Sequence, residues 1–472
     1  MAGVLDYFDS EDFKEILRQY EESVKSGERI YMDGDDLTDI ADDYNYHNRT
    51  AEADAAIALA IEFNPEAVGP MLYKARKAIK AKDFKTAEQY ANKIQALDTF
   101  EATFLRAEIL IANGDVKAGD KLIEQYAKEI PADEYPDFLK SVIDFYLDYD
   151  LFSMASKWAS FNPDIKSDEF KELSARILFG LGKYQASETL FNELLDKNPY
   201  STIYWNALAG VQYMKKDFSS ALTSCDYALA IDPNDADSIL SKANTLYTMG
   251  NYAAAQEHFQ KYIEMKPDDE LGYLHLGNCI ISQGSDEEGI KVFQKGISVS
   301  PTNSPFLPEI YQEMAFAYNK LGQIDKALMC LDMTEHLNCD HISIHVTKGH
   351  LLLFNHREDE AKKVFEHALK ESGNDPKTRL KIIISYQDNK YLEHAYKAYL
   401  DFFNSVDDSF TEGYAFFALC CNDLSKNDEF LYYLKKACEI NPEEAKLVLD
   451  GFFPEDMDPK DYYEYALKHI DD

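Results

Sequence analysis

Apolar residues recur three and four positions apart along almost the whole chain, and the alternation of large and small apolar residues repeats every 34 residues. Within one such unit, positions 4, 8 and 11 share one face of a first helix, and positions 20, 24 and 27 share one face of a second. The pattern therefore predicts a chain built from pairs of amphipathic helices.

The same frame fits most of the chain. Its units begin near Gly34, Val68, Phe100, Asp168, Thr202, Ala236, Glu270, Pro308, Ile342, Pro376 and Thr411. The stretch between about Ala132 and Ser167 fits poorly and is interpreted as one degenerate unit. With that stretch included, the sequence predicts about twelve units.

Proline and glycine mark the ends of the predicted helices. Proline cannot continue a helix, and it stands near position 32 as Pro199, Pro233, Pro267 and Pro301. Glycine readily adopts the left-handed conformation that ends many helices, and it stands at position 15 as Gly182, Gly250, Gly284 and Gly322. Position 15 is therefore the predicted turn between the two helices of a unit.

Two positions of the frame hold small residues. Position 8 is occupied by Ala41, Ala75, Ala107, Ala175, Ala209, Ala243, Gly277, Ala315, Gly349 and Ala418. Position 20 is occupied by Ala53, Ala87, Gly119, Ser187, Ala221, Ala255, Gly289, Ala327, Ala361 and Ala395. An amphipathic helix alone does not require small residues at fixed places, so we expect helices to approach closely there.

These features resemble the tetratricopeptide-repeat (TPR) superfamily, and in particular its long, acidic bacterial members that consist of little except repeats. The resemblance covers about nine tenths of the sequence and is clearest from Asp168 to Pro301. It implies an all-α fold, a right-handed superhelical solenoid of about twelve helix–turn–helix units with capping helices at both ends. Ile383 at position 8 and Phe430 at position 20 are large, which predicts distortion of their units.

The stretches outside the frame are short. Residues 1–33 contain Ser10 followed by an apolar stripe, and they are expected to form the N-terminal capping helix. Residues 34–301 are predicted to hold units 1–8, with the degenerate unit near 132–167, and residues 302–445 to hold units 9–12 after a proline-rich joint. Residues 446–472, with a helix over 461–470, are predicted to cap the other end.

The charge narrows the class of partner. The chain has 85 acidic and 48 basic residues, a formal net charge of −37. Nucleic acids and anionic membranes repel such a surface, so neither is expected as a partner, whereas a basic protein or peptide is attracted. The alternative explanation is that the acidic surface simply keeps an apolar-rich solenoid soluble.

The sequence contains no segment expected to insert into a membrane, since no run of 18 apolar residues and no leader pattern is present. The seven cysteines include no Cys-x-x-Cys pair, and we interpret them as buried, reduced thiols. Both observations favour a cytoplasmic location.

No catalytic, cofactor-binding or metal-binding residue is assigned. The stretches outside the repeats are too short for a catalytic domain, and no phosphate loop or nucleophile motif is present, so the chain is predicted not to be an enzyme. Six of the eleven histidines cluster as His336, His341, His345, His350, His356 and His367. His341 and His345 have a spacing that could serve one metal ion, but the frame favours packing and surface roles for the cluster.

The first helix of each unit is expected to line a concave groove. Its candidate binding residues are Asn206, Tyr213, Asn244, Tyr247, His275 and Asn278. Amide side chains both donate and accept hydrogen bonds, so they can pair with the backbone of an extended peptide. The prediction is a non-catalytic scaffold that binds a protein or peptide in this groove. Two alternatives stay open: a structural assembly subunit, and a metal- or pH-responsive regulator centred on the histidine cluster.

Overall fold

The protein is all-α in the part that the computed structural model describes, which comprises residues 8, 10–27, 30–46, 49–161, 167–301, 304–407, 409–454 and 457–469. This part contains 27 α-helices, two short 3₁₀ helices and no strand. None of its helices is long and apolar enough to cross a bilayer. The chain divides into two compact units, Met1–Cys279 and Ile280–Asp472, while the predicted division after residue 301 stays a prediction.

The first unit begins with the helices that follow Ser10 and ends inside α17. Its helices are α2 (Glu11–Ser26), α3 (Gly34–Tyr46), α4 (Thr50–Phe63), α5 (Val68–Lys80), α6 (Phe84–Ile94), α7 (Thr99–Ala112), α8 (Val116–Tyr126), α9 (Tyr135–Asp148), α10 (Phe152–Ala159), α11 (Asp168–Gly180), α12 (Tyr184–Lys197), α13 (Thr202–Met214), α14 (Phe218–Ile231), α15 (Ala236–Thr248), α16 (Tyr252–Met265) and most of α17 (Glu270–Ser282).

The second unit continues the same succession of helices. It contains α18 (Asp286–Val299), α19 (Leu307–Lys320), α20 (Ile324–Asp332), η1 (Met333–His336), α21 (His341–Phe354), α22 (Glu358–Glu371), α23 (Pro376–Asp388), α24 (Leu392–Phe403), α25 (Tyr414–Asp423), α26 (Asn427–Ile440), α27 (Pro442–Leu449), η2 (Asp450–Phe452) and α28 (Pro459–His469).

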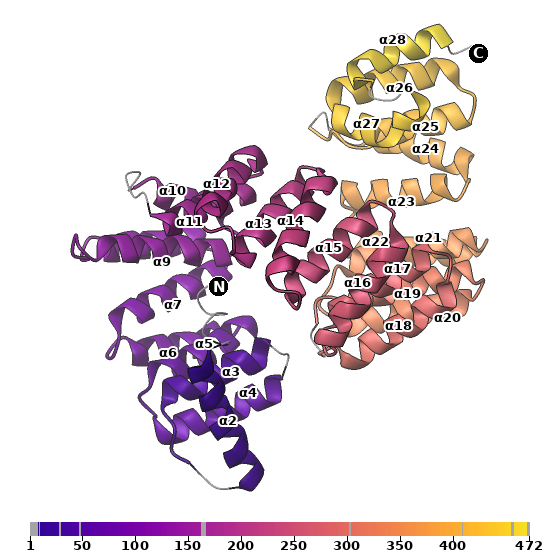
Figure 1. The fold of residues 1–472 in the computed structure, drawn as a ribbon. Coiled ribbons are helices and arrows are strands. Elements are labelled where there is room, and N and C mark those ends of the chain that lie inside the picture. Colours follow the sequence, from indigo (N-terminus) through magenta and orange to yellow (C-terminus); the bar gives the residue numbers. More distant parts are fainter. Residues whose placement is uncertain are drawn as a thin grey trace. The chain divides into compact units, whose positions relative to one another are not determined.

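The described residues hold 24 α-helices in succession from α3 to α26, the number that the predicted twelve helix pairs require. Within each unit, the two helices of a pair pack against each other, and the second helix of one pair packs against the first helix of the next (Figure 1). The prolines end second helices as predicted. For example, α14 ends at Ile231 and α16 ends at Met265, each two residues before its proline.

The turn within a pair is left-handed wherever the structure describes position 15. The positive φ angles belong to Lys82, Gly114, Asp150, Gly182, Lys216, Gly250, Gly284, Gly322, His356, Lys390 and Ser425. The next residue often caps the second helix, as Asp217 does by accepting a hydrogen bond from the backbone N–H of Ser220 at 3.2 Å. The turn geometry therefore comes from the fold, and non-glycine residues adopt it at a conformational cost.

Close helix contact explains the small residues at positions 8 and 20. Within one pair, the Ser187 hydroxyl at position 20 donates to the carbonyl oxygen of Ala175 at position 8, at 2.8 Å. A Cβ added to Gly119 would lie 3.1 Å from the carbonyl oxygen of Ala107, its position 8 partner. The described alanines at both positions are buried. Side-chain size at these two positions thus sets the distance between paired helices.

The two large residues are accommodated without loss of helix. Ile383 lies in α23, which keeps 13 residues, and Phe430 lies in α26, which keeps 14. Both side chains are buried in the core of the second unit. The expected distortion therefore does not interrupt either helix.

The degenerate stretch also folds as a pair, α9 and α10, although its sequence departs from the frame. Trp158 takes the place of a packing residue and is 1% exposed. Its indole N–H and the Tyr146 hydroxyl both donate to Asp120 Oδ1 on α8, at 2.8 and 2.9 Å, and Lys157 pairs with the other carboxylate oxygen. A buried carboxylate with three partners thus attaches this pair to its neighbour.

Helices cover both ends of the array. Ser10 accepts from the backbone N–H of Phe13 at 3.2 Å and caps α2, as predicted. At the other end α28 packs on α26, and Tyr462 stacks on Phe453 with ring centroids 3.9 Å apart. Ile470, part of the predicted apolar stripe, lies outside the described residues. These helices bury apolar surface that the terminal pairs would otherwise expose.

The same substitution is expected to have opposite effects at two glycines of first helices. In Gly349→Ala, the new Cβ would lie 2.2 Å from the Phe365 ring, which should lower the unfolding free energy by about 1–3 kcal/mol. In Gly210→Ala, no atom lies within 4 Å, and the better helix former should raise it by about 0.5–1 kcal/mol. Urea denaturation followed by circular dichroism measures both, and equal effects would contradict the close-contact explanation.

Glycine is expected to stabilise the turns that now hold other residues. Lys216→Gly should raise the unfolding free energy by about 0.5–1 kcal/mol, because it relieves a left-handed residue with φ of 63°. The matched control is Lys121→Gly in the exposed interior of α8, which should lower it by a similar amount. Thermal unfolding of both variants tests this, and destabilisation by Lys216→Gly would refute it.

Candidate functional site

The first helices of the first unit lie side by side and share one surface. Direct packing joins α3 to α5, α5 to α7, α9 to α11 and α13 to α15. We call the surface at positions 2, 5, 9, 12 and 13 of these helices the first-helix face, with residue 136 as position 1 of the α9–α10 pair. Its side chains include Asp42, Arg76, Glu101, Glu108, Asp144, Asp148, Glu172, Arg176, Phe179, Asn206, Tyr213, Asp237, Asn244 and Tyr247.

A row of aromatic rings occupies position 12 of three successive pairs. Each ring packs against the ring at position 17 of its own pair: Phe179 on Tyr184, Tyr213 on Phe218 and Tyr247 on Tyr252, with centroids 5.9, 5.5 and 5.3 Å apart. The Tyr213 hydroxyl also shares a hydrogen bond of 2.9 Å with Thr248 Oγ1 on the next first helix. These contacts fix the rings, so binding a ligand there requires little further ordering.

The predicted asparagines have different environments. Both ends of the Asn206 amide are used within the array, because Nδ2 donates to Asp235 at 2.6 Å and Oδ1 accepts from Ser238 at 2.5 Å. The Asn244 amide is half-buried and forms no hydrogen bond with another described residue. Asn278 stands at the same repeat position on α17. Asn206 therefore links two repeats, whereas the Asn244 side chain does not.

His275 contributes to packing between two repeats. Its ring stacks on Phe259 of α16, with centroids 5.6 Å apart and planes 21° apart. Burial lowers the pKa of the imidazole, so the neutral form is favoured. The frame alone did not reveal this, because Phe259 belongs to the preceding pair.

Carboxylates dominate the charges on the first-helix face. Three basic residues there are paired across neighbouring helices: Arg76 with Glu108 at 3.2 Å, Lys140 with Glu169 at 2.7 Å and Arg176 with Asp144 at 3.0 Å. Four further carboxylates, Glu101, Asp148, Glu172 and Asp237, form no ion pair with another described residue. After these three residues are paired, negative charge thus remains on this surface.

These four carboxylates combine solvent access with partial desolvation. Asp148 and Asp237 are exposed, and Glu101 and Glu172 are partly exposed. Surrounding protein nevertheless raises the pKa of all four carboxyl groups, and burial is the largest cause in each case. A cation interacts more strongly with a partly desolvated carboxylate than with a fully solvated one.

The cysteines offer no reactive nucleophile. All seven are free thiols, and five are buried. Burial raises the pKa of Cys225, Cys420 and Cys421 to about 12, which keeps them protonated at neutral pH. The predicted reduced state is consistent with this environment.

Two family models, both described as tetratricopeptide repeat, match residues 173–236 and 212–275. Protein STIP1 homolog of Dictyostelium discoideum is 31% identical over 91 residues, 19% of this chain and 16% of the relative. Anaphase-promoting complex subunit 3 of Schizosaccharomyces pombe is 23% identical over 190 residues, 40% of this chain and 28% of the relative. The chain thus spans less than a third of the length of either relative.

Among solved structures, a tetratricopeptide repeat protein from Parabacteroides merdae aligns with a TM-score of 0.41 and 15% identity, covering 53% of this chain and 97% of that one. The matched family models lie on pairs α11–α12 to α15–α16, where the small positions, left-handed turns and end-of-repeat prolines are most regular. The same features recur in the other pairs on both sides. Residues 173–275 therefore match tetratricopeptide-repeat models, and the rest of the described chain continues the same all-α helix pattern.

Proposed function

We propose that the chain is a non-catalytic scaffold whose first-helix face binds a basic, extended segment of another protein. The observation that carries the proposal is the set of four carboxylates, Glu101, Asp148, Glu172 and Asp237, which have no ion-pair partner among the described residues and are partly desolvated. Repeat arrays offer extended surfaces for such segments.

Binding would use the charges and the rings together. Lysine or arginine side chains of the segment would pair with the carboxylates, which offsets the cost of keeping these groups charged in partly desolvated positions. Apolar side chains between them would lie against the rings of Phe179, Tyr213 and Tyr247, and the Asn244 amide would bond to the segment's backbone. The rigid receptor would lose little conformational entropy on binding.

Neutralising the four carboxylates should weaken binding. Peptide display on the wild-type chain should enrich sequences rich in Lys and Arg. The Glu101→Gln/Asp148→Asn/Glu172→Gln/Asp237→Asn variant should bind an enriched peptide roughly tenfold or more weakly, because exposed charge pairs contribute about 0.2–1 kcal/mol each. Fluorescence anisotropy at low and high salt measures this, and raising the salt should weaken wild-type binding. Affinity should also fall as the pH is lowered, since a raised pKa leads these groups to protonate first.

A control variant that loses four negative charges outside the first-helix face tests whether the peptide is attracted to that face or to the net charge of the whole chain. Glu129, Asp196, Glu257 and Glu264 are exposed carboxylates outside the first-helix face. Converting these four to amides should leave peptide affinity close to wild type at moderate salt. If both variants lose affinity equally, or if display enriches acidic peptides, the basic-segment proposal fails.

The asparagines provide a second, independent test. Asn206→Ala should lower the unfolding free energy by about 1 kcal/mol, since it removes hydrogen bonds between two repeats. Asn244→Ala/Asn278→Ala should weaken peptide binding, and the loss from the Asn244 change alone should come without a comparable loss of stability. Denaturation and anisotropy on the same samples make the comparison. Unchanged affinity in the double variant would exclude Asn244 and Asn278 from the binding surface.

An assembly subunit is the second candidate, and the C-terminal end of the chain favours it. Leu447 on α27 is 84% exposed and Leu467 on α28 is 48% exposed, although both helices belong to the segment that covers the array. One relative is named as a subunit of the anaphase-promoting complex. Light scattering after size exclusion distinguishes the candidates, because a stable oligomer broken by Leu447→Ser would support assembly through this end.

We propose a cytoplasmic location from the state of the cysteines. Seven free thiols, mostly buried, are suited to a reducing compartment such as the cytoplasm.

A further inference from the structure

Positions 4 and 26 of a repeat face each other across the helix pair. The contact recurs with different chemistry: an ion pair between Lys171 and Glu193 at 2.6 Å, stacked Trp205 and Tyr227 rings 4.6 Å apart, and the Lys436 ammonium 5.5 Å from the Tyr414 ring centroid. In the α21–α22 pair both positions are histidine. His345 and His367 therefore meet because the repeat geometry brings these two positions together.

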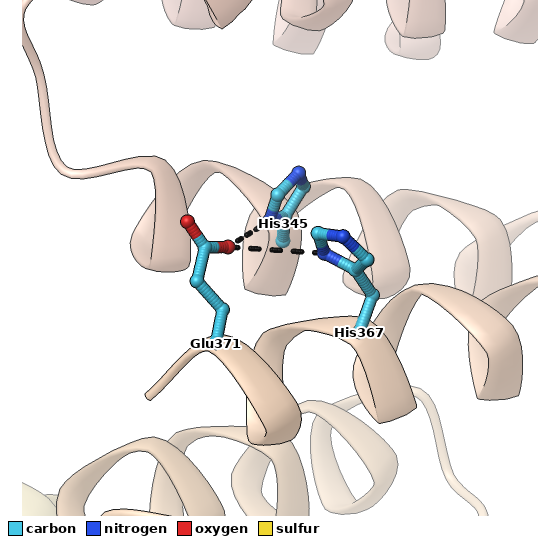
Figure 2. Close-up of side chains that lie close together, drawn as sticks. All are labelled: His345, His367 and Glu371. Carbon is cyan, nitrogen blue, oxygen red and sulfur yellow. Dashed lines mark ion pairs between the residues drawn. The ribbon is translucent and has the colours of Figure 1, made fainter. Parts of the chain in front are cut away.

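The two imidazoles share a carboxylate. His345 and His367 lie edge to face with ring centroids 4.7 Å apart. Glu371, one turn after His367 on α22, places Oε2 at 3.2 Å from His345 Nδ1 and 3.8 Å from His367 Nδ1 (Figure 2). One ligand atom from each residue lies within 4.8 Å of the other two. This is a compact set of two nitrogen ligands and one oxygen ligand.

One of the ligand atoms lacks a well-formed hydrogen bond. His345 Nδ1 is shielded from solvent and has no hydrogen bond that meets geometric criteria, although Glu371 Oε2 is only 3.2 Å away. The contact is therefore close but poorly aligned. Shielded polar atoms usually have a partner, and a cation between the three residues would supply one.

We propose that His345, His367 and Glu371 form a zinc-binding site. Zn²⁺ binds imidazole nitrogen and carboxylate oxygen at about 2.0–2.2 Å, so tetrahedral ligands lie roughly 3.3–3.5 Å apart. The two nitrogen–oxygen separations, 3.2 and 3.8 Å, are close to that spacing. Three protein ligands leave the fourth position to water, and the ion would join α21 to α22.

The surroundings permit a cation to enter. His345 and His367 line a hollow of about 320 Å³ together with Glu335, Lys348, Lys363 and Val364. Lys348 is paired with Asp332, so its charge is largely compensated, and Lys363 is exposed on the rim. Glu335 adds a second carboxylate near the site.

The four-residue spacing suggested that His341 and His345 could bind one metal ion, but in the structure His345 pairs with His367. His341 begins α21, and its Nδ1 lies 3.8 Å from Cys339 Sγ. His345, four residues later, faces His367 on the other helix instead. His341 is therefore the natural control, because it belongs to the same helix and to the alternative pair.

Zinc titration of the full-length chain without an affinity tag tests the site. Isothermal titration calorimetry with ZnCl₂, in excess Mg²⁺ to occupy the acidic surface, should show one tight site per chain. His345→Gln, His367→Gln and Glu371→Gln should each weaken this site by at least about tenfold, as loss of a group that supports a metal site commonly does. His341→Gln should keep wild-type affinity.

A spectroscopic measurement separates coordination from folding effects. CoCl₂ should give the intense visible absorption of tetrahedral cobalt with the wild type and with His341→Gln, and His367→Gln should lose it. Circular dichroism without metal should be the same for the wild type, His367→Gln and Glu371→Gln, because His367 and Glu371 are exposed. Wild-type zinc affinity in His367→Gln, or loss of zinc binding in His341→Gln, would overturn the assignment. The outcome is independent of whether the first-helix face binds basic peptides.

Discussion

The structure depends on one contact, the close approach of the two helices of each pair at positions 8 and 20. The Ser187 hydroxyl reaches the Ala175 carbonyl there, and the space beside Ala107 is limited to a glycine at residue 119. Where both residues are small, as in these two pairs, the side chain of one helix reaches the backbone of the other. The other recurring contacts follow from this close approach.

This close approach frees the remaining positions to carry different chemistry. Positions 4 and 26 meet in four pairs, as an ion pair, an aromatic stack, a cation–π contact or two histidines. Similarly, position 12 meets position 17 as a pair of rings in three successive repeats. The repeat thus acts as a constant frame in which side-chain identity decides what each site can bind.

The carboxylates of the first-helix face differ in whether they have an ion-pair partner. On the first-helix face, Arg76, Lys140 and Arg176 form ion pairs with carboxylates of neighbouring helices. The carboxylates that remain are accessible but partly desolvated, as at Glu101 and Glu172. Solubility does not require charges in such positions, since fully exposed carboxylates serve it at lower cost. Their placement is what favours a basic ligand over the solubility explanation.

The sequence by itself determined the helix pairs, the turns, the small positions and the N-terminal cap, because each depends on local conformation or on a repeated steric limit. It did not determine which side chains contact each other across helices and repeats. Asn206 bonds to the next repeat, His275 stacks on Phe259, and His345 faces His367 rather than His341. The partner is 29 residues away for Asn206, 16 for His275 and 22 for His345, and none of the three lies on the same helix as the residue it contacts. Only the packing of helices decides which of them meet, because side-chain contact depends on distances across helices.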